Sequence, residues 1–256
     1  MASFPKMRDL PCVVETKGWG WARFNAPMAL SDNFWVGTDP DGNRWLTKLT
    51  GDFRAYREIV FGRLAQQMNW SCQSTVFMRL DAQSACVLGV TPDILQSAHW
   101  FMEEHAYQPC SDGCQLESLV NEQITVENMA GLPIKHIMDW PKSELAACLF
   151  GGNEPPGRFF TTSHEFVIID SELMFATSPC SFESTDWWGS ETLPSPDGYR
   201  LALNVCNDLL SLGHSGLKRA LALPAGTLIE EQWPIAPLLF QSFDFAASFC
   251  SREPEA

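Results

Sequence analysis

Residues 34–49, FWVGTDPDGNRWLTKL, contain the clearest structural pattern in the chain. Two segments with the pattern of strands, 34–37 and 44–49, flank Asp-Pro-Asp-Gly-Asn at 39–43, a combination that is typical of a tight turn between two strands. The stretch therefore predicts a β-hairpin. Lys48 lies at the end of its returning strand, directly after Thr47.

The segment after this hairpin predicts a helix. Apolar residues recur over 53–70 at helical spacing and predict a helix that packs through one face; they are Tyr56, Ile59, Val60, Leu64 and Met68. Further strands are predicted at 72–80 and 85–90, and a short connecting strand near 100–104. The first hundred residues thus follow the order strand, strand, helix, strand, strand.

The second half of the chain is predicted to be mainly helical. A helix over 141–150 is opened by Pro141 and ended by Gly151 and Gly152, and an apolar strand over 165–170 ends at Asp170. Three further helices are expected at 198–211, 215–222 and 237–249. Because no repeat and no low-complexity linker divides the sequence, residues 1–256 are expected to form one domain.

Composition limits the classes of function. The 256 residues are 45% hydrophobic and 19% charged, which is typical of a folded globular chain. The net charge of -14 repels phosphate backbones, so no nucleic-acid partner is expected. No apolar run reaches the roughly 18 to 20 residues that span a bilayer, so we expect no membrane association and a cytoplasmic location.

The nine cysteines are expected to be reduced thiols, because an odd number does not form a fully paired disulfide framework. Cys110 and Cys114 form the one close pair in the sequence. Two interpretations of that pair remain open, half of a zinc site or a loop with two free thiols, and no second pair with matching spacing follows.

Lys48 and Glu58 are candidate nucleotide-binding residues. A strand lysine that contacts phosphates needs an anchor, because its four-carbon stem is flexible, and a glutamate on the following helix supplies one. Glu58 is placed on that helix, ten residues after Lys48. The alternative is that both are ordinary solvated charges on the surface.

Asp170 is the candidate metal ligand. It ends the apolar run Phe-Val-Ile-Ile at 166–169, and a carboxylate at the mouth of a buried strand is suited to hold a magnesium ion that bridges ATP phosphates. The alternative is that Asp170 caps a turn. The order of the candidates along the chain, Lys48, Glu58 and then Asp170, favours the metal interpretation.

This order, together with Gly152-Asn153 and the later Ile169-Asp170, resembles the HipA-like kinases, which are related to protein kinases and phosphatidylinositol kinases. The resemblance spans roughly residues 33 to 180. It implies an α+β, two-lobed kinase-like fold, with a small antiparallel-strand N-lobe carrying one helix (about 1–104) and a mainly helical C-lobe (about 105–256). It also implies ATP and Mg²⁺ as cofactors, a protein substrate, and an adenine site bordered by Trp100, Phe101, Met102, Glu103 and Glu104.

The chain departs from that family in the catalytic loop. HipA-like kinases carry Gly-Asn-x-Asp-Arg there, and the aspartate accepts the proton of the substrate hydroxyl. Here the loop is Gly-Asn-Glu-Pro-Pro-Gly-Arg at 152–158, which places Pro155 and Pro156 where the family has Asp and Arg. Glu154 is the candidate substitute base, acting beside Asp170, and Arg158 is a candidate contact for the γ-phosphate.

Three functions follow from these residues. The first is an ATP-binding kinase that phosphorylates a protein hydroxyl. The second is a catalytically impaired pseudokinase that binds nucleotide or protein, because a proline neither moves a proton nor ligates magnesium. The third is an acidic structural protein without a ligand, for which the series Lys48, Glu58 and Asp170 is a coincidence.

Overall fold

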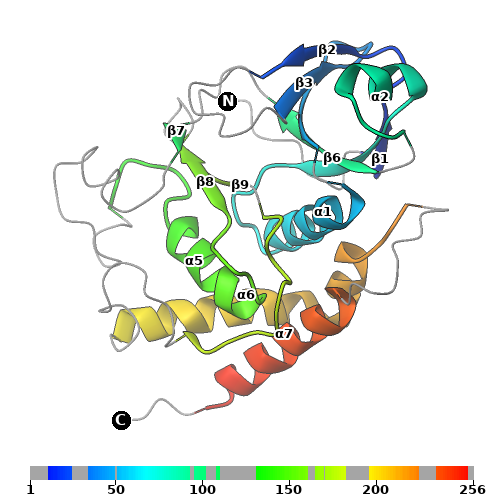
Figure 1. Cartoon of the computed structure of the whole chain (residues 1–256). Helices are drawn as coiled ribbons and strands as arrows, with labels where there is room; N and C mark the ends of the chain where they lie inside the picture. Colours follow the sequence, from blue (N-terminus) through cyan, green and yellow to red (C-terminus); the bar gives the residue numbers. More distant parts are fainter. Residues whose placement is uncertain are drawn as a thin grey trace.

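A computed structural model describes residues 11–24, 34–49, 51–92, 95–101, 108–109, 131–160, 165–169, 171–182, 196–224 and 235–252. This part of the chain begins with four strands and ends with two long helices (Figure 1). The strands are β1 (Val13–Glu15), β2 (Gly20–Arg23), β3 (Phe34–Thr38), β4 (Arg44–Lys48), β5 (Thr75–Arg79), β6 (Gln96–Phe101), β7 (Gln108–Pro109), β8 (Gly157–Phe160) and β9 (Phe166–Ile169). The helices are α1 (Asp52–Gln67), α2 (Ala82–Leu88), α5 (Asp139–Leu149), α6 (Pro196–Ala220) and α7 (Ile235–Cys250).

The first six strands form one sheet in the order β1-β5-β6-β4-β3-β2. All neighbours pair antiparallel except β1, which pairs parallel with β5, so the prediction of an antiparallel sheet is wrong at this one strand. β4 lies between β3 and β6, and Lys48 is opposite Phe34 on one side and Ser97 on the other. The candidate lysine is therefore at the end of an inner strand.

The hairpin β3–β4 is confirmed, and Asp39 explains its turn. The Asp39 carboxylate accepts hydrogen bonds from the backbone amides of Asp41 and Asn43, at 3.0 and 2.8 Å. Its second oxygen accepts from Asn43 Nδ2 and Trp45 Nε1, and Gly42 adopts a φ of +84°. These bonds outweigh the effect of burial, which would raise the pKa of Asp39, so that this pKa lies below its usual value.

Residues 85–90 were predicted as a strand, but 85–88 instead belong to helix α2, which ends at Gly89. The Asp81 carboxylate caps the helix by accepting a hydrogen bond from the Ser84 amide at 2.8 Å, and Gly89 ends it at a φ of +70°. The apolar run Ala-Cys-Val-Leu at 85–88 is short enough to fit either structure, and the two caps settle it as helix. The N-terminal half thus has two helices, α1 and α2, and not one.

Helix α1 is confirmed, but the expectation that only one face is packed is wrong. Its residues 55–62 are buried without interruption, because the helix lies between the six-stranded sheet and helix α6 (Figure 1). Tyr56 joins the helix to the second half of the chain, since its hydroxyl donates to the Leu221 carbonyl at 2.8 Å. The polar residues Arg57 and Glu58 are therefore buried and need partners inside the fold.

The second half contains the antiparallel sheet β7-β8-β9 and three helices. Helix α5 confirms the predicted helix at 141–150, and α6 combines the two predicted helices at 198–211 and 215–222, with a break at Gly213 (φ 57°, ψ 178°). Helix α7 confirms the last one. None of the described helices combines the length and the apolar content that a bilayer span requires.

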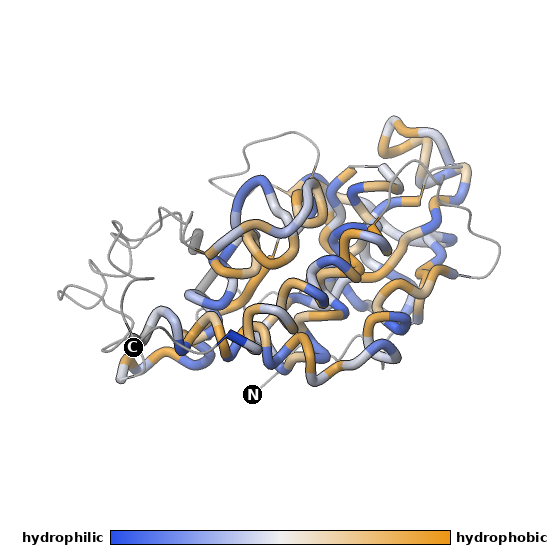
Figure 2. Tube along the Cα trace, turned by 90° about the horizontal axis from the view of Figure 1, so that it is seen from below, coloured by the Kyte–Doolittle hydropathy of each residue, from blue (hydrophilic) through white to orange (hydrophobic). Residues whose placement is uncertain are grey.

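Two apolar clusters hold the fold together. The larger one joins α1 to α5, α6, α7 and β9, and includes Phe61, Leu64, Phe150 and Phe166. The smaller one lies around the first sheet and α2 and includes Trp19 and Trp45, whose rings stack 6.1 Å apart. Hydrophobic and hydrophilic segments alternate along the helices in Figure 2, as expected for helices that pack against other elements.

The turn after α5 packs directly against residues 174–178. The backbone carbonyl of Gly151 accepts hydrogen bonds from the amides of Ala176 and Thr177, both at 2.9 Å, and Phe175 donates to Phe150 at 2.8 Å. Gly151 has a φ of +59°, and a Cβ there would overlap the Thr177 carbonyl. The loop over 152–156, which precedes β8, therefore begins beside the segment that follows Asp170.

Substituting Gly151 with alanine should lower the free energy of unfolding by about 3 kcal/mol, because left-handed strain and backbone overlap act together. Gly89→Ala is the matched control: it has a similar φ of +70° and no atom within 4 Å of the added Cβ, so it should cost only about 1 kcal/mol. Urea unfolding measures both values. Equal losses in the two variants would show that the contact with residues 174–178 is loose.

Candidate functional site

Lys48 is positioned by the sheet. Thr47, the residue before it, is buried and donates its hydroxyl to the Ser97 carbonyl on β6 at 2.6 Å. The Lys48 side chain is 16% exposed, and its Nζ lies 5.8 Å from the centre of the Phe34 ring on β3. The ammonium is thus held close to the protein surface and is not extended into solvent.

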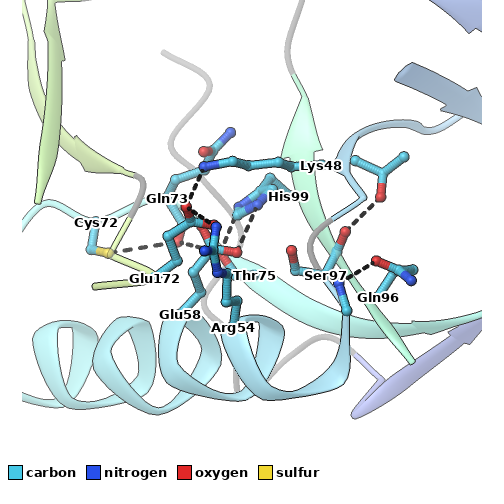
Figure 3. A network of polar contacts seen from close by, with 12 residues as sticks. Lys48, Arg54, Glu58, Cys72, Gln73, Thr75, Gln96, Ser97, His99 and Glu172 are labelled. Carbon is cyan, nitrogen blue, oxygen red and sulfur yellow. Dashed lines mark hydrogen bonds and ion pairs between the residues drawn. The ribbon is translucent and has the colours of Figure 1, made fainter. Parts of the chain in front are cut away.

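Glu172 forms an ion pair with Lys48, with 3.0 Å between Nζ and Oε1. The same Oε1 lies 3.3 Å from the guanidinium of Arg54, in the first turn of α1. Figure 3 shows these side chains meeting above α1, which they reach from three separate parts of the chain: the end of β4, the start of α1 and the segment after β9. One carboxylate therefore connects the sheet, the central helix and the second half.

Arg57, one helical turn further along α1, binds the backbone of the segment that contains Glu172. Its guanidinium donates to the backbone carbonyls of Glu172 and Phe175, at 3.5 and 3.3 Å, and stacks 4.1 Å from the Phe53 ring. Burial and the nearby charge of Arg54 lower the pKa of Arg57, while Glu172 opposes that shift. Arg57 thus fixes the backbone of residues 172–175 against α1.

Glu58 is almost completely buried, with 2% of its side chain exposed, and pairs with His99 of β6. Its Oε2 lies 3.4 Å from His99 Nε2, and His99 Nδ1 lies 2.9 Å from the hydroxyl of Thr75 on β5. Burial alone would raise the pKa of Glu58, but its interaction with His99 and the charge of Lys48 together hold it below its usual value. Lys48 and Glu58 are therefore close enough to interact electrostatically.

The site carries more cationic than anionic groups around its centre. The cations Lys48, Arg54 and Arg57 surround Glu172, and Glu58 is the second carboxylate beside them. This is a local exception in a chain whose net charge is -14. A cluster of this kind fits the phosphate groups of a nucleotide, because cations with side-chain N–H donors bind phosphate oxygens well.

Two residues predicted for the catalytic loop lie outside this network. Arg158 pairs with the buried Glu144 of α5, and its guanidinium lies 5.1 Å from the Trp140 ring. Glu154 is exposed on the loop between α5 and β8. Their catalytic and phosphate-contacting roles stay predictions.

Several other candidates cannot be placed. Asp170, Met102, Glu103 and Glu104 lie outside the described residues, and Trp100 and Phe101 are placed only by their backbone at the end of β6. Among the residues that the structure describes, no group of three or more His, Cys, Asp or Glu side chains is arranged to hold a metal. The magnesium site at Asp170 therefore stays a prediction.

The sequence interpretation missed Glu172, Arg54, Arg57 and His99. Glu172 could have been considered from its position, two residues after Asp170. The two arginines are three residues apart on one helix and so share a face, which is a usable signal. The pairing of Glu58 with His99 had no local signal, because it depends on how β6 is placed in the sheet.

Comparison with known proteins identifies the fold. A crystal structure of CtkA, a proinflammatory kinase of Helicobacter pylori, superimposes with a TM-score of 0.53 at 10% sequence identity, over 85% of this chain and 91% of that one. No protein-family model and no curated sequence matches the chain. The likeness shows a two-lobed, kinase-like α+β fold, as the sequence predicted.

Glu58→Gln should destabilise the fold in a pH-dependent way. The lowered pKa of Glu58 means that its stabilising effect is present above the ordinary glutamate value of 4.5 and is lost as the pH falls through the folded-state pKa. The variant should lose about 2 kcal/mol at pH 6, and the difference from the parent should shrink below pH 4.5. Urea unfolding across this range measures it.

Glu15→Gln serves as the control for this experiment. Glu15 pairs with Arg79 at 2.7 Å, but both side chains are about half exposed, so the loss should be small at every pH. A loss at Glu58 that stays constant from pH 6 to pH 3.5 would contradict the buried-charge interpretation.

Proposed function

We propose that this chain is a HipA-like kinase that binds ATP with Mg²⁺ at the Lys48 site and transfers phosphate to a protein hydroxyl. The observation that carries the proposal is the meeting of Lys48, Arg54 and Glu172 at the end of an inner strand, next to the segment that follows Asp170. In kinase-like folds this is where a strand lysine contacts the nucleotide phosphates. The kinase-like fold found by comparison supports the same placement.

The proposal gives each residue a role. Lys48 and Arg54 would hold phosphate oxygens, Glu58 would contribute to the electrostatic environment of Lys48, and Asp170 would hold magnesium. The segment Trp100–Glu104 would border adenine, because β6 runs from Ser97, which is paired with Lys48, to Phe101. When bound, Mg-ATP supplies the phosphoryl group and the counter-charge. The chain supplies orientation and cationic side chains.

We also propose a domain organisation, a phosphate acceptor and a cellular location. We assign residues 1–104 to the N-lobe and 105–256 to the C-lobe of one domain. The acceptor is proposed to be a protein hydroxyl, and the location cytoplasmic. Arg158 keeps its proposed contact with the γ-phosphate only if its pair with Glu144 opens when nucleotide binds.

A second candidate function, a nucleotide-binding pseudokinase, is favoured by the catalytic loop. Pro155 and Pro156 occupy the positions where HipA-like kinases carry Asp and Arg, and a proline side chain has no group that accepts a proton. Glu154 is the one carboxylate in the sequence 152–158, and its side chain is exposed. The two functions share the binding site and differ only in whether Glu154 replaces the missing base.

Lys48→Met should remove most of the stabilisation that Mg-ATP gives the parent protein. A ligand at 100 times its dissociation constant adds about 2.7 kcal/mol of apparent stability. Methionine keeps the length of the apolar stem but has no charge for phosphate. Lys135→Met is the control, because Lys135 also forms an ion pair, with Glu165 at 2.7 Å, but outside the site. Thermal unfolding with and without Mg-ATP measures the shift.

A parent protein that gains no stability from Mg-ATP would contradict both the kinase and the pseudokinase proposals and favour an acidic structural protein. Equal shifts in Lys48→Met and the parent would place the nucleotide at another part of the surface. A lost shift in Lys135→Met would show that any lysine substitution disturbs the fold.

Glu154→Gln separates the kinase from the pseudokinase. A positioned general base contributes about 10²- to 10⁴-fold, so the variant should lose that factor in phosphoryl transfer while its Mg-ATP affinity stays that of the parent. Transfer of radiolabelled phosphate to the chain itself or to added proteins measures the rate. A parent that binds Mg-ATP without transfer is a pseudokinase, and equal transfer by both proteins would show that Glu154 is not the base.

A further inference from the structure

Two glutamates lie near Lys48, and they differ in what else they bind. Glu58 is buried between α1 and β6 and pairs with His99, whose other ring nitrogen contacts Thr75. Its carboxylate is thus engaged by the sheet. Glu172 places its Oε1 3.0 Å from Lys48 Nζ, which is the length of a direct charge-assisted contact.

Glu172 is itself held firmly. The residue is only 7% exposed, and its backbone carbonyl accepts a hydrogen bond from Arg57. Arg57 also binds the Phe175 carbonyl, so one guanidinium fixes both sides of this short segment. Arg54 adds a second cation at Glu172 Oε1. A carboxylate fixed at its backbone and its side chain can hold a flexible lysine in one place.

We infer that Glu172 is the positioning residue for Lys48, the role that the sequence assigned to Glu58; this inference rests on the proposed nucleotide-binding function. Glu172 lies two residues after Asp170, so the same segment that carries the proposed metal ligand also holds the phosphate-binding lysine. Contacts with Arg54 and Arg57 of α1 thereby connect Lys48 to the segment that carries the proposed metal ligand.

The contact with Glu172 is compatible with phosphate binding by the same lysine. An ammonium group has three N–H donors, and a single carboxylate oxygen accepts one of them. Because Arg54 shares that oxygen, its cation also offsets the repulsion between Glu172 and an incoming phosphate. The Arg54 side chain is about half exposed, whereas the side chains of Lys48 and Glu172 are mostly buried.

The first test measures Lys48 without nucleotide. Lysines are acylated by acetic anhydride, and mass spectrometry gives the extent at each site in the parent, Glu172→Gln and Glu172→Asp. Gln at 172 removes the charge that holds the ammonium, so labelling of Lys48 should rise about fivefold or more. Asp keeps the charge on a shorter stem and should restore most of the protection.

The matched control is Glu165→Gln, which opens the pair between Glu165 and Lys135. In this variant Lys48 labelling should equal that of the parent. A packing role for residue 172 predicts the opposite order of variants, because Gln preserves the shape of Glu and Asp does not. Unchanged Lys48 labelling in Glu172→Gln overturns the inference.

The second test measures Mg-ATP affinity by calorimetry in the same proteins. Glu172→Gln should weaken binding about tenfold and Glu172→Asp less, while Glu165→Gln should bind as the parent does. Tighter binding by Glu172→Gln would show that Glu172 competes with phosphate, and unchanged binding would show that it does not position Lys48; either result overturns the inference. If the parent itself does not bind Mg-ATP, the proposed function fails and the positioning role fails with it.

Discussion

The ion pair between Lys48 and Glu172 is the contact on which the arrangement of the site depends. It joins an inner strand of the first sheet to the segment after β9, across more than a hundred residues of sequence. Such a contact between distant segments forms only when α1 is buried between the sheet and α6, because Arg54 and Arg57 of that helix hold Glu172 in place. Because the same packing buries Glu58, its carboxylate needs a partner inside the fold, and that partner is His99.

This central helix also explains why the site is cationic in an acidic protein. Charged side chains that enter a protein interior must be paired, and pairing orients them. Here the arginines of α1 bind the carboxylate and backbone carbonyls of one segment, while the lysine approaches from the sheet. The loop that begins at Gly151 is hydrogen-bonded to the end of that same segment. The Lys48 cluster and the loop that follows α5 are therefore parts of one packed unit.

Local sequence signals predicted the parts of the fold that local chemistry determines. The hairpin was predictable because Asp39 and Gly42 specify its turn. Helix α5 was predictable from its proline and from the glycines that follow it, although it begins at Asp139, two residues before Pro141. Helix α2 was missed, although Asp81 and Gly89 cap it, because a four-residue apolar run suits a strand equally well. The kinase-like fold was predicted from the order of candidate residues, and the structural comparison confirmed it.

The sequence was less informative about the partners of buried charges. Pairing Lys48 with Glu58 followed from their spacing, but the pairs of Glu172 with Lys48 and of Glu58 with His99 depend on strand order and helix burial, which no local pattern encodes. We propose that the Lys48 cluster binds nucleotide phosphates. A crystal structure with magnesium and a non-hydrolysable ATP analogue would show whether it does. We expect a phosphate oxygen within hydrogen-bonding distance of Lys48 Nζ; phosphates bound elsewhere, with Lys48 unengaged, would rule out this role of the cluster.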